Sequence, residues 1–454
     1  MVNQFIEYRL DISKIPKDGA VIDIFYNQDE TVSPISSLVP VNRYDFVSIK
    51  DDTMYLDIQK MMTRMQATDL LWDSFNVFKI YIYLPDSVLH SKSGLLEFVM
   101  SSCVQAFLSN VYKTQNTIII THSGKVNERV KNCISMIEKV QLARLFSMLP
   151  ANIATPEKIA KRIQTIFDKV PKVSTRLLTE TYLKSHHFNL LLSVNQGSKN
   201  KACMLVVERK TNSKQSTVCI IGKGITFDSG GLAIKPLRYM KDMKYDKIGA
   251  ISGAMALLHL MELKSTKHLN LVGIFPFAEN LISSGSIRPG DVIKSHLGKT
   301  VEVSNPDAEG RLILADALSY AHKYEPNLVI DIATLTGHAE SISCWHKGYY
   351  YAIPENLKRL TETATNDIGE RMIPMPTWGE YREVLQSTVA DLINDSDVCD
   401  DSTSAALFLK EFIPKDSQWL HIDLAHEQDD NHIPNGAGVR SIIEIVEQTY
   451  GKKK

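Results

Sequence analysis

Along residues 185–340, hydrophobic residues gather in short runs that are rich in β-branched residues. Polar loops and helical patterns separate these runs. Such runs are typical of the central strands of a mostly parallel sheet. Residues 248–264 form a strong helical pattern, and the alternation of strand, loop and helix predicts a doubly wound α/β domain. The runs predicted as strands are residues 190–194, 203–208, 216–222, 269–277 and 327–334.

The first 135 residues have a different pattern, in which polar segments interrupt short apolar runs. Strands are predicted at residues 47–50, 78–85 and 116–123, and a helix at 94–113. We therefore expect an α/β fold in two parts. A smaller N-terminal α/β domain covers residues 1–135, and a larger C-terminal domain with a mostly parallel or mixed sheet flanked by helices covers residues 136–454.

Composition narrows the classes of function. The chain has 454 residues, 44% of them hydrophobic and 23% charged, with a formal net charge of −1. That balance predicts neither nucleic acid nor an anionic membrane as a partner. Six cysteines without a CxxC pair favour a reducing compartment. No signal peptide or membrane span is expected from the sequence, so we expect a cytoplasmic protein, with an organelle left open.

A glycine-rich loop follows the strand predicted at 216–222. It reads GKGITFDSGG and presents Lys223 and Asp228 among four glycines, which permit close approach or positive φ. It matches neither GxGxxG nor GxxxxGK[ST], so a phosphate-binding loop is not predicted. The sequence at 298–300, GKT, also fails that pattern, because position 293 is Ile.

A second loop, SNPDAEGR at 304–311, carries Asp307 and Glu309 two residues apart. An alternative interpretation is a helix start, with Asn305 as cap and Pro306 at the first helical position. Asp246 could likewise simply cap the helix that follows it. From residue types alone, both alternatives stay open.

Taken together, these acidic residues and Lys223 offer oxygen and nitrogen ligands that suit Mg, Mn, Co or Zn. Two ions would need bridging carboxylates, a role open to Asp228 and Glu309. Without metal, clustered carboxylates repel one another, which predicts raised pKa values. Spacing is thus compatible with a metal site but does not establish one.

Several ordered motifs resemble the leucyl aminopeptidase (cytosol aminopeptidase) family of two-metal metallopeptidases. The family signature Asn-Thr-Asp-Ala-Glu-Gly-Arg-Leu corresponds to NPDAEGRL at 305–312. GKGITFDSGGLAIKP (222–236), MKYD (243–246), RPGDVI (288–293), ADAL (315–318) and DIATLTG (331–337) follow the family order. The resemblance covers roughly residues 140–450 and identifies 136–454 as a catalytic metallopeptidase domain.

The resemblance implies a hydrolase, an aminopeptidase that removes leucine-like or other hydrophobic N-terminal residues from peptides by means of a metal-bridged hydroxide. It implies two divalent ions, Zn or Mn with Co or Mg as alternatives, and a Lys223 whose pKa is depressed so that it can act as a ligand. Lys235 would stabilise the oxyanion, and Arg311 would hold a bicarbonate as general base. The implied metal ligands are Lys223, Asp228, Asp246, Asp307 and Glu309, and the implied substrate-binding residues are Met243, Asn305, Thr334, Leu335 and Gly337.

Family members are commonly homohexamers, arranged as a dimer of trimers, and the same is expected here. Three alternatives remain at this stage: a non-catalytic family member acting as a structural or binding subunit, a nucleic-acid-binding enzyme, and a two-metal phosphatase or nuclease. The sequence has no basic patch that would favour a nucleic-acid-binding enzyme. A two-metal phosphatase or nuclease would predict His ligands or extra basic residues, which these loops lack. Departures from the family pattern include Pro306, Lys247, His338 and the stretch that begins at Asp395. We predict that they alter the pocket rim.

Overall fold

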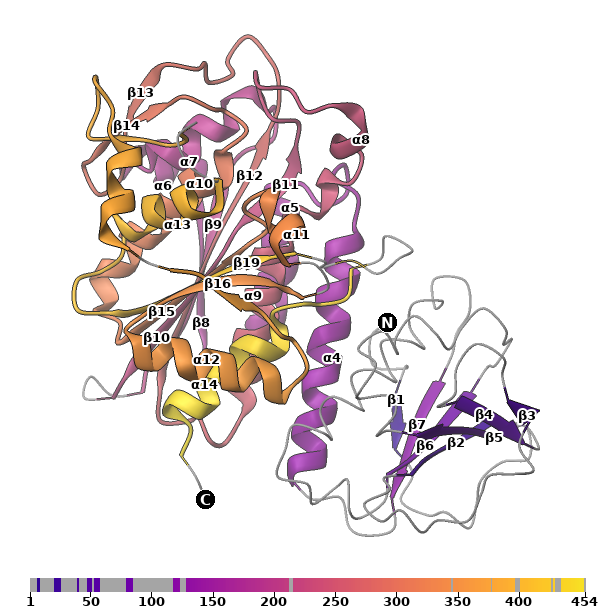
Figure 1. The fold of residues 1–454 in the computed structure, drawn as a ribbon. Helices are drawn as coiled ribbons and strands as arrows, with labels where there is room; N and C mark the ends of the chain where they lie inside the picture. The colour runs from indigo at the N-terminus through magenta and orange to yellow at the C-terminus, as the bar shows by residue number, and fades with distance from the viewer. Residues whose placement is uncertain are drawn as a thin grey trace. The chain divides into compact units, whose positions relative to one another are not determined.

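The computed structural model describes residues 128–211, 215–343, 346–376, 378–396, 401–425, 428 and 434–452, together with seven strands between residues 6 and 122. The chain divides into two compact units (Figure 1). One contains residues 1–138 with 367–369, and the other contains residues 139–366 with 370–454. The domain boundary that the sequence suggests between residues 135 and 136 stays a prediction.

The seven strands of the first unit form one sheet, in the order β1-β7-β6-β2-β5-β4-β3. Its first five strands pair in parallel, and β4 and β3 add an antiparallel edge. The three strands predicted here are present as β4, β6 and β7, whereas the helix predicted at 94–113 lies outside the described residues. The strands are β1 (Ile6–Tyr8), β2 (Ala20–Phe25), β3 (Val39–Pro40), β4 (Val47–Lys50), β5 (Thr53–Asp57), β6 (Lys79–Leu84) and β7 (Thr117–His122).

The second unit is built on a large mixed sheet in the order β17-β16-β19-β15-β10-β12-β9-β8, with β11 paired to β12. Strands β19, β15, β10 and β12 run parallel, and β16, β9 and β8 join in antiparallel fashion. The α/β class with a mostly parallel, mixed sheet is confirmed. The strands are β8 (Ser174–Thr179), β9 (Cys203–Arg209), β10 (Thr217–Gly222), β11 (Gly224–Asp228), β12 (Asn270–Asn280), β15 (Leu328–Ala333), β16 (Gly348–Ile353), β17 (Ile373–Pro374) and β19 (Gln418–Leu424), with β13 (Asp291–Lys294), β14 (Thr300–Val303) and β18 (Leu392–Ile393) in a small separate sheet.

Helices cover both faces of the large sheet, as the doubly wound pattern predicts. Figure 1 shows α7, α10 and α13 over one face and α9, α12 and α14 over the other. The sheet residues between these layers form the core, and β9, β12 and β15 are buried along their whole length. The described helices are α4 (Glu128–Met148), α5 (Pro156–Phe167), α6 (Glu180–Ser185), α7 (Asn189–Val194), α8 (Leu237–Met240), α9 (Ile248–Glu262), α10 (Glu309–Ala321), α11 (His338–Ser343), α12 (Glu355–Asp367), α13 (Asp401–Lys410) and α14 (Val439–Tyr450).

One predicted strand is wrong: residues 190–194 belong to helix α7. Leu190, Leu191 and Val194 are buried, which is the spacing of one helical face. A short apolar run satisfies both a buried strand and a buried helical turn, so its pattern alone does not separate them.

The parallel strands bring distant parts of the sequence to one edge of the sheet. Strand β10 ends at Gly222, β12 at Asn280 and β15 at Ala333. Because neighbouring parallel strands end on the same side, Lys223 and Thr334, which directly follow β10 and β15, lie close together. Sites in open α/β sheets gather at this carboxyl edge.

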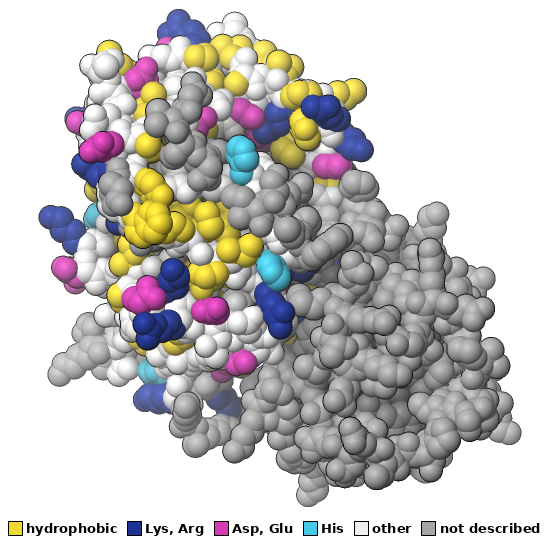
Figure 2. Space-filling view, viewed as in Figure 1, with side chains coloured by type: hydrophobic (Ala, Val, Ile, Leu, Met, Phe, Trp, Pro, Cys, Tyr) yellow, Lys and Arg dark blue, Asp and Glu magenta, His cyan; other side chains and the backbone are white. Residues whose placement is uncertain are grey.

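Composition-based expectations can be compared with the described part of the chain. None of its helices combines the length and the apolar character needed to cross a membrane. Cys133, Cys203 and Cys219 are buried and are not part of a disulfide. On the face shown in Figure 2, lysine and arginine side chains are scattered among acidic and hydrophobic ones, without a continuous basic field.

Candidate metal centre

Lys223 lies in an enclosed cluster of carboxylates. Its Nζ is 2.7 Å from Asp246 Oδ1 and 2.9 Å from Glu309 Oε1, and it donates a 2.8 Å hydrogen bond to the carbonyl of Thr334. The Lys223 side chain is 4% exposed. Gly310 provides the room, because a Cβ there would lie 2.6 Å from Lys223 Cε. The sequence thus places glycine where this lysine crosses helix α10.

A second lysine, Lys235, occupies the neighbouring half of the site. Its Nζ lies 2.9 Å from Asp228 Oδ2 and 2.6 Å from Asp307 Oδ1, and its side chain is 17% exposed. The other oxygen of Asp228 accepts hydrogen bonds from the Gly230 N–H (2.9 Å) and Asn280 Nδ2 (2.8 Å). Gly230 has φ +84°, which explains the glycine in this tight turn.

The two halves meet in a buried group of three carboxylates. Asp228, Asp246 and Glu309 each offer an oxygen, and these atoms all lie within 4.8 Å of one another. Asp246 Oδ2 is buried and receives no hydrogen bond from any residue that the structure describes. An unsatisfied buried carboxylate oxygen is costly unless a cation or donor compensates it. Buried oxygen ligands in this arrangement fit a divalent metal ion.

The pKa values reflect crowding of charge. Burial raises the pKa of Asp246 well above its ordinary value, and burial together with Glu309 raises the pKa of Asp228. Burial, Asp228 and Glu309 raise the pKa of Asp307 to about 7. The predicted upward shift is therefore confirmed for the three aspartates. It is wrong for Glu309, where the attraction of Lys223 and then of Lys235 outweighs burial and lowers the pKa.

Lys223 shows the opposite of the depressed pKa expected for a metal ligand. Burial lowers its pKa, but the attraction of Asp246 and Glu309 outweighs burial and the net pKa is raised. Among the residues that the structure describes, the ion pairs of the clustered carboxylates are with Lys223 and Lys235. A divalent ion bound to the same carboxylates would repel the ammonium and favour neutral Lys223.

A helix does start at the second acidic loop, with Glu309 in its first turn, but neither Asn305 nor Asp246 is the N-cap residue of a helix. Helix α10 begins only at Glu309, with Ala308 as its N-cap residue. Asn305 instead accepts the backbone N–H of Asp307 at 2.9 Å, so it holds a turn before the helix. Helix α9 begins at Ile248, and Asp246 directs its carboxylate to Lys223 rather than to a helix end.

Arg311 is buried within α10 and contacts the segment that follows β18. Its Nη1 donates to the Asn394 carbonyl (2.6 Å) and lies 3.3 Å from Asp395 Oδ1. The second oxygen of Asp395 accepts from Asn305 Nδ2 at 2.8 Å. Arg311 is thus connected through Asp395 and Asn305 to the turn that presents Asp307.

The remaining predicted pocket residues differ in how closely they join the carboxylates. The Thr334 hydroxyl donates to Asp246 Oδ1 at 2.9 Å. Leu335 is half-buried and Gly337 is exposed in the same loop. Met243 is half-buried three residues before Asp246, in the short helix Met243–Tyr245. The substrate roles of these residues stay predictions.

Lys247, predicted to alter the rim, is fully buried. Its Nζ donates to the carbonyls of Ser147 (2.8 Å), Leu149 (3.0 Å) and Lys244. Burial lowers the pKa of this side chain to about 7. Lys247 therefore ties the segment before α9 to the end of α4, and its side chain contributes a structural contact.

Two supporting residues were missed in the sequence. Asn280, at the end of β12, donates to Asp228. Asp423 on β19 is fully buried and accepts hydrogen bonds from the Leu335 N–H (2.7 Å) and the Thr336 hydroxyl (2.8 Å). Polar residues at the carboxyl ends of otherwise apolar strands were the available signal.

Known proteins resemble this chain in sequence. Residues 141–443 match the cytosol aminopeptidase family, catalytic domain. A probable cytosol aminopeptidase of Legionella pneumophila is 36% identical over 312 residues, covering 68% of this chain and 64% of the relative. That of Protochlamydia amoebophila is 40% identical over 311 residues, covering 66% and 61%. The matched region thus spans less than two thirds of these relatives.

Solved structures resemble the chain over nearly its whole length. The bottromycin maturation enzyme BotP in complex with Mn has a TM-score of 0.79 at 25% identity and covers 95% of this chain and 100% of its own. Caenorhabditis elegans leucine aminopeptidase has a TM-score of 0.83 at 20% identity and covers 99% of each chain, which shows a shared fold. With a family match over residues 141–443, this chain belongs to the cytosol aminopeptidase family.

Proposed function

We propose that this chain is a metal-dependent aminopeptidase, which hydrolyses the N-terminal peptide bond of peptides. The observation that carries the proposal is the buried group of Asp228, Asp246 and Glu309, bracketed by Lys223 and Lys235. A purely structural ion cluster would not require Asp246 Oδ2 to be left without a donor among the described residues.

Lys223, Asp228, Asp246, Asp307 and Glu309 would hold two divalent ions, with Asp228 and Glu309 shared. Such ions supply Lewis acidity at a peptide carbonyl. Lys235 keeps its ammonium charge, because Asp228, Glu309 and Asp307 together outweigh burial and raise its pKa. Its partly exposed side chain is suited to donate to the oxygen that becomes negative during hydrolysis.

The substrate preference follows from the loop after β15 and from Met243. We propose that Met243, Thr334, Leu335 and Gly337 contact the first side chain of the peptide and the adjacent backbone, with a preference for leucine-like residues. Asn305 would contact the substrate from the signature loop. Asp423 orders the loop after β15, because its carboxylate accepts a 2.7 Å hydrogen bond from the Leu335 N–H.

The general base is proposed to lie at Arg311. The resemblance implies a bicarbonate there, and Asp395 already brings a carboxylate to within 3.3 Å of Arg311 Nη1. Activity in bicarbonate-free buffer separates the two. Activity that depends strongly on added bicarbonate would support the bicarbonate ion as the base. Activity that needs no bicarbonate but is lost in Asp395→Asn would support the Asp395 carboxylate.

The test is release of amino-acid amides or anilides, with Mn, Co or Zn added, by the wild type and by Asp307→Ala. We expect metal-dependent turnover that the variant loses. No metal-dependent turnover by the wild type would overturn the proposal and favour a non-catalytic structural or binding subunit. Leu, Met, Phe and Cys-Gly substrates compared in one assay would measure the preference.

Assembly is a separate proposal. We expect a homohexamer, a dimer of trimers, with a mass about six times 51.1 kDa by light scattering. A monomer at working concentration would contradict it without bearing on the chemistry of the metal centre.

A further inference from the structure

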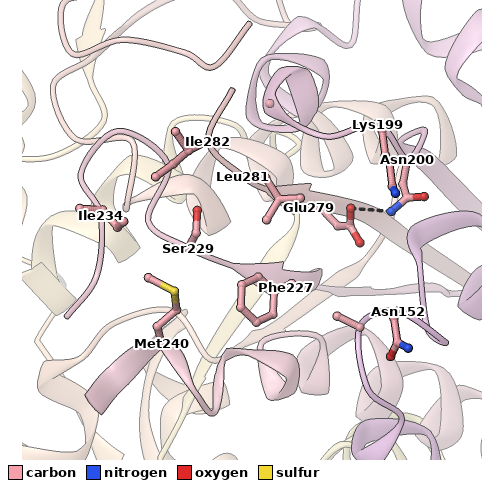
Figure 3. Close-up of a pocket in the computed structure, with 12 residues that line it drawn as sticks. Asn152, Lys199, Asn200, Phe227, Ser229, Ile234, Met240, Glu279, Leu281 and Ile282 are labelled. Atoms are coloured by element: carbon pink, nitrogen blue, oxygen red, sulfur yellow. Dashed lines mark hydrogen bonds between the residues drawn. The ribbon is translucent and has the colours of Figure 1, made fainter. Parts of the chain in front are cut away.

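A cavity of about 660 Å³ lies beside the metal centre and plays no part in the proposed reaction (Figure 3). Phe227 lines it, whereas the next residue, Asp228, joins the carboxylate cluster. Ser229 also lines the cavity, whereas Asp228, between Phe227 and Ser229, is not one of the lining residues. Ile234 also lines the cavity, directly before Lys235. One strand and one loop are therefore shared by both sites.

One side of the cavity is apolar. Phe227, Ile234, Met240, Leu281 and Ile282 line it, and Ile234 and Ile282 are exposed although they are large hydrophobic residues. The volume falls within the usual range for small-molecule sites, which are lined mostly by apolar side chains with a few polar groups. This side suits an aliphatic group.

The opposite side carries a buried carboxylate. Glu279 is 3% exposed, and its Oε2 accepts hydrogen bonds from Ser198 Oγ (2.5 Å) and Asn200 Nδ2 (2.8 Å). Its other oxygen receives no hydrogen bond from the residues that the structure describes, and in Figure 3 it points away from Asn200. Because Glu279 lines the cavity, an ammonium group there would give this oxygen a charge-assisted hydrogen bond.

A positive charge stands at the same side of the cavity. Lys199, next to Asn200, lines the cavity and is exposed, so its ammonium is available to an anionic group. A ligand that satisfies both ends carries an ammonium and a carboxylate close together, with an aliphatic group beyond them. An apolar α-amino acid has this chemistry.

We propose that the cavity is a second site, distinct from the metal centre, for a free apolar α-amino acid. Its ammonium pairs with Glu279 and its carboxylate with Lys199. Its side chain packs on Phe227 and Ile234. An occupant would contact the loop that holds Lys235. That consequence rests on the proposed function, whereas binding itself does not.

The test uses the full-length protein, stripped of metal with a chelator, and measures binding of L-leucine by titration calorimetry. Leucinamide lacks the carboxylate, and N-acetylleucine lacks the ammonium. We expect saturable leucine binding, and N-acetylleucine at least about tenfold weaker, since a hydrogen bond to a charged group is lost. Asp307→Ala should bind leucine as the wild type does, which separates this site from the metal centre.

Variants assign the two ends. Glu279→Gln should weaken leucine and leucinamide by about tenfold, whereas Lys199→Ala should weaken leucine alone by a few-fold. Lys201→Ala, at an exposed lysine outside the cavity lining, is the matched control and should change neither. Circular dichroism checks the fold of Glu279→Gln. If Glu279→Gln misfolds, Lys199→Ala still tests the site, because Lys199 is exposed.

Three outcomes would overturn the proposal. One is the absence of saturable leucine binding to the stripped wild type. Another is binding that Asp307→Ala abolishes while Glu279→Gln leaves it intact, which places the ligand at the metal centre. The third is equal weakening of leucine by Lys199→Ala and Lys201→Ala. None of these results depends on peptide hydrolysis, so failure of the aminopeptidase proposal would be seen separately.

Discussion

The two halves of the metal centre use the same chemical pair, an ammonium and carboxylates, in different surroundings. Lys223 is 4% exposed and is held by Asp246, Glu309 and a main-chain carbonyl. Lys235 is 17% exposed, and among the described residues its ammonium pairs with the carboxylates of Asp228 and Asp307. The enclosed lysine cannot meet a substrate without rearrangement, whereas the partly exposed one can. The comparison assigns the first to holding the site together and the second to the reaction.

The largest expected effect is on the stability of Lys223→Met. Removing one partner of a buried ion pair leaves uncompensated charge, so the metal-free protein should lose about 3–5 kcal/mol in free energy of unfolding. Added Mn should restore a large part, because the ion replaces the missing positive charge. Denaturant unfolding with and without Mn measures this. An equal loss in Lys235→Met would remove the distinction between the two halves.

Lys235→Met should act on turnover instead. Loss of one oxyanion donor costs about 10²–10³ in kcat, with a small change in KM. Because the Lys235 side chain is partly exposed, its removal should destabilise the fold less than the change at Lys223. Steady-state kinetics on leucine anilide provides the measurement. A raised KM with unchanged kcat would assign Lys235 to ordinary substrate binding.

Metal removal tests whether the carboxylates belong to one centre. An ion at a hundred times its Kd stabilises the native state by about 2.7 kcal/mol, which should appear as a higher Tm. Asp246→Asn should lose that rise, because it removes the carboxylate whose Oδ2 lacks a donor among the described residues. A full metal-dependent rise in Asp246→Asn would exclude Asp246 from the ligands.

Asp423 supports the loop that contacts Lys223, so a change at Asp423 tests the Lys223 half of the metal centre indirectly. Asp423→Asn weakens the hold on the loop after Thr334, whose carbonyl and hydroxyl contact Lys223 and Asp246. Supporting residues of metal sites typically change metal affinity by 10–100-fold, and we expect about tenfold. Asp316→Asn is the matched control, because Asp316 is equally buried but accepts the N–H groups of Leu191 and His296 rather than groups of this loop. Equal effects in both variants would indicate general destabilisation.

The sequence allowed the strands and the acidic loops to be predicted, since apolar runs and glycine-rich turns depend on local chemistry. It did not allow the lowered pKa of Glu309 to be predicted, because that shift depends on two lysines brought together by folding. Asn280 and Asp423 escaped notice for a related reason. A single polar residue at the end of a strand has no motif, and its partner lies on another strand. The run at 190–194 failed because burial on one face serves helix and strand alike.

A more exposed cluster of ion pairs, around Glu411, should contribute less stability than the pairs of the metal centre. Glu411 pairs with Lys299 and Arg382 at 2.6 Å each, and those cations are 33% and 66% exposed. Hydrogen bonding from Arg382 lowers the pKa of Glu411 from 4.5 to about 2. A depressed carboxyl pKa contributes stability that is present above pH 4.5 and is lost as the pH falls towards 2. Solvent screening keeps this contribution within about 1 kcal/mol. Glu411→Gln should therefore flatten the acid limb of the stability curve only slightly, as measured by urea unfolding between pH 2 and 6. A loss as large as that of Lys223→Met would show that exposure does not set the strength of these pairs.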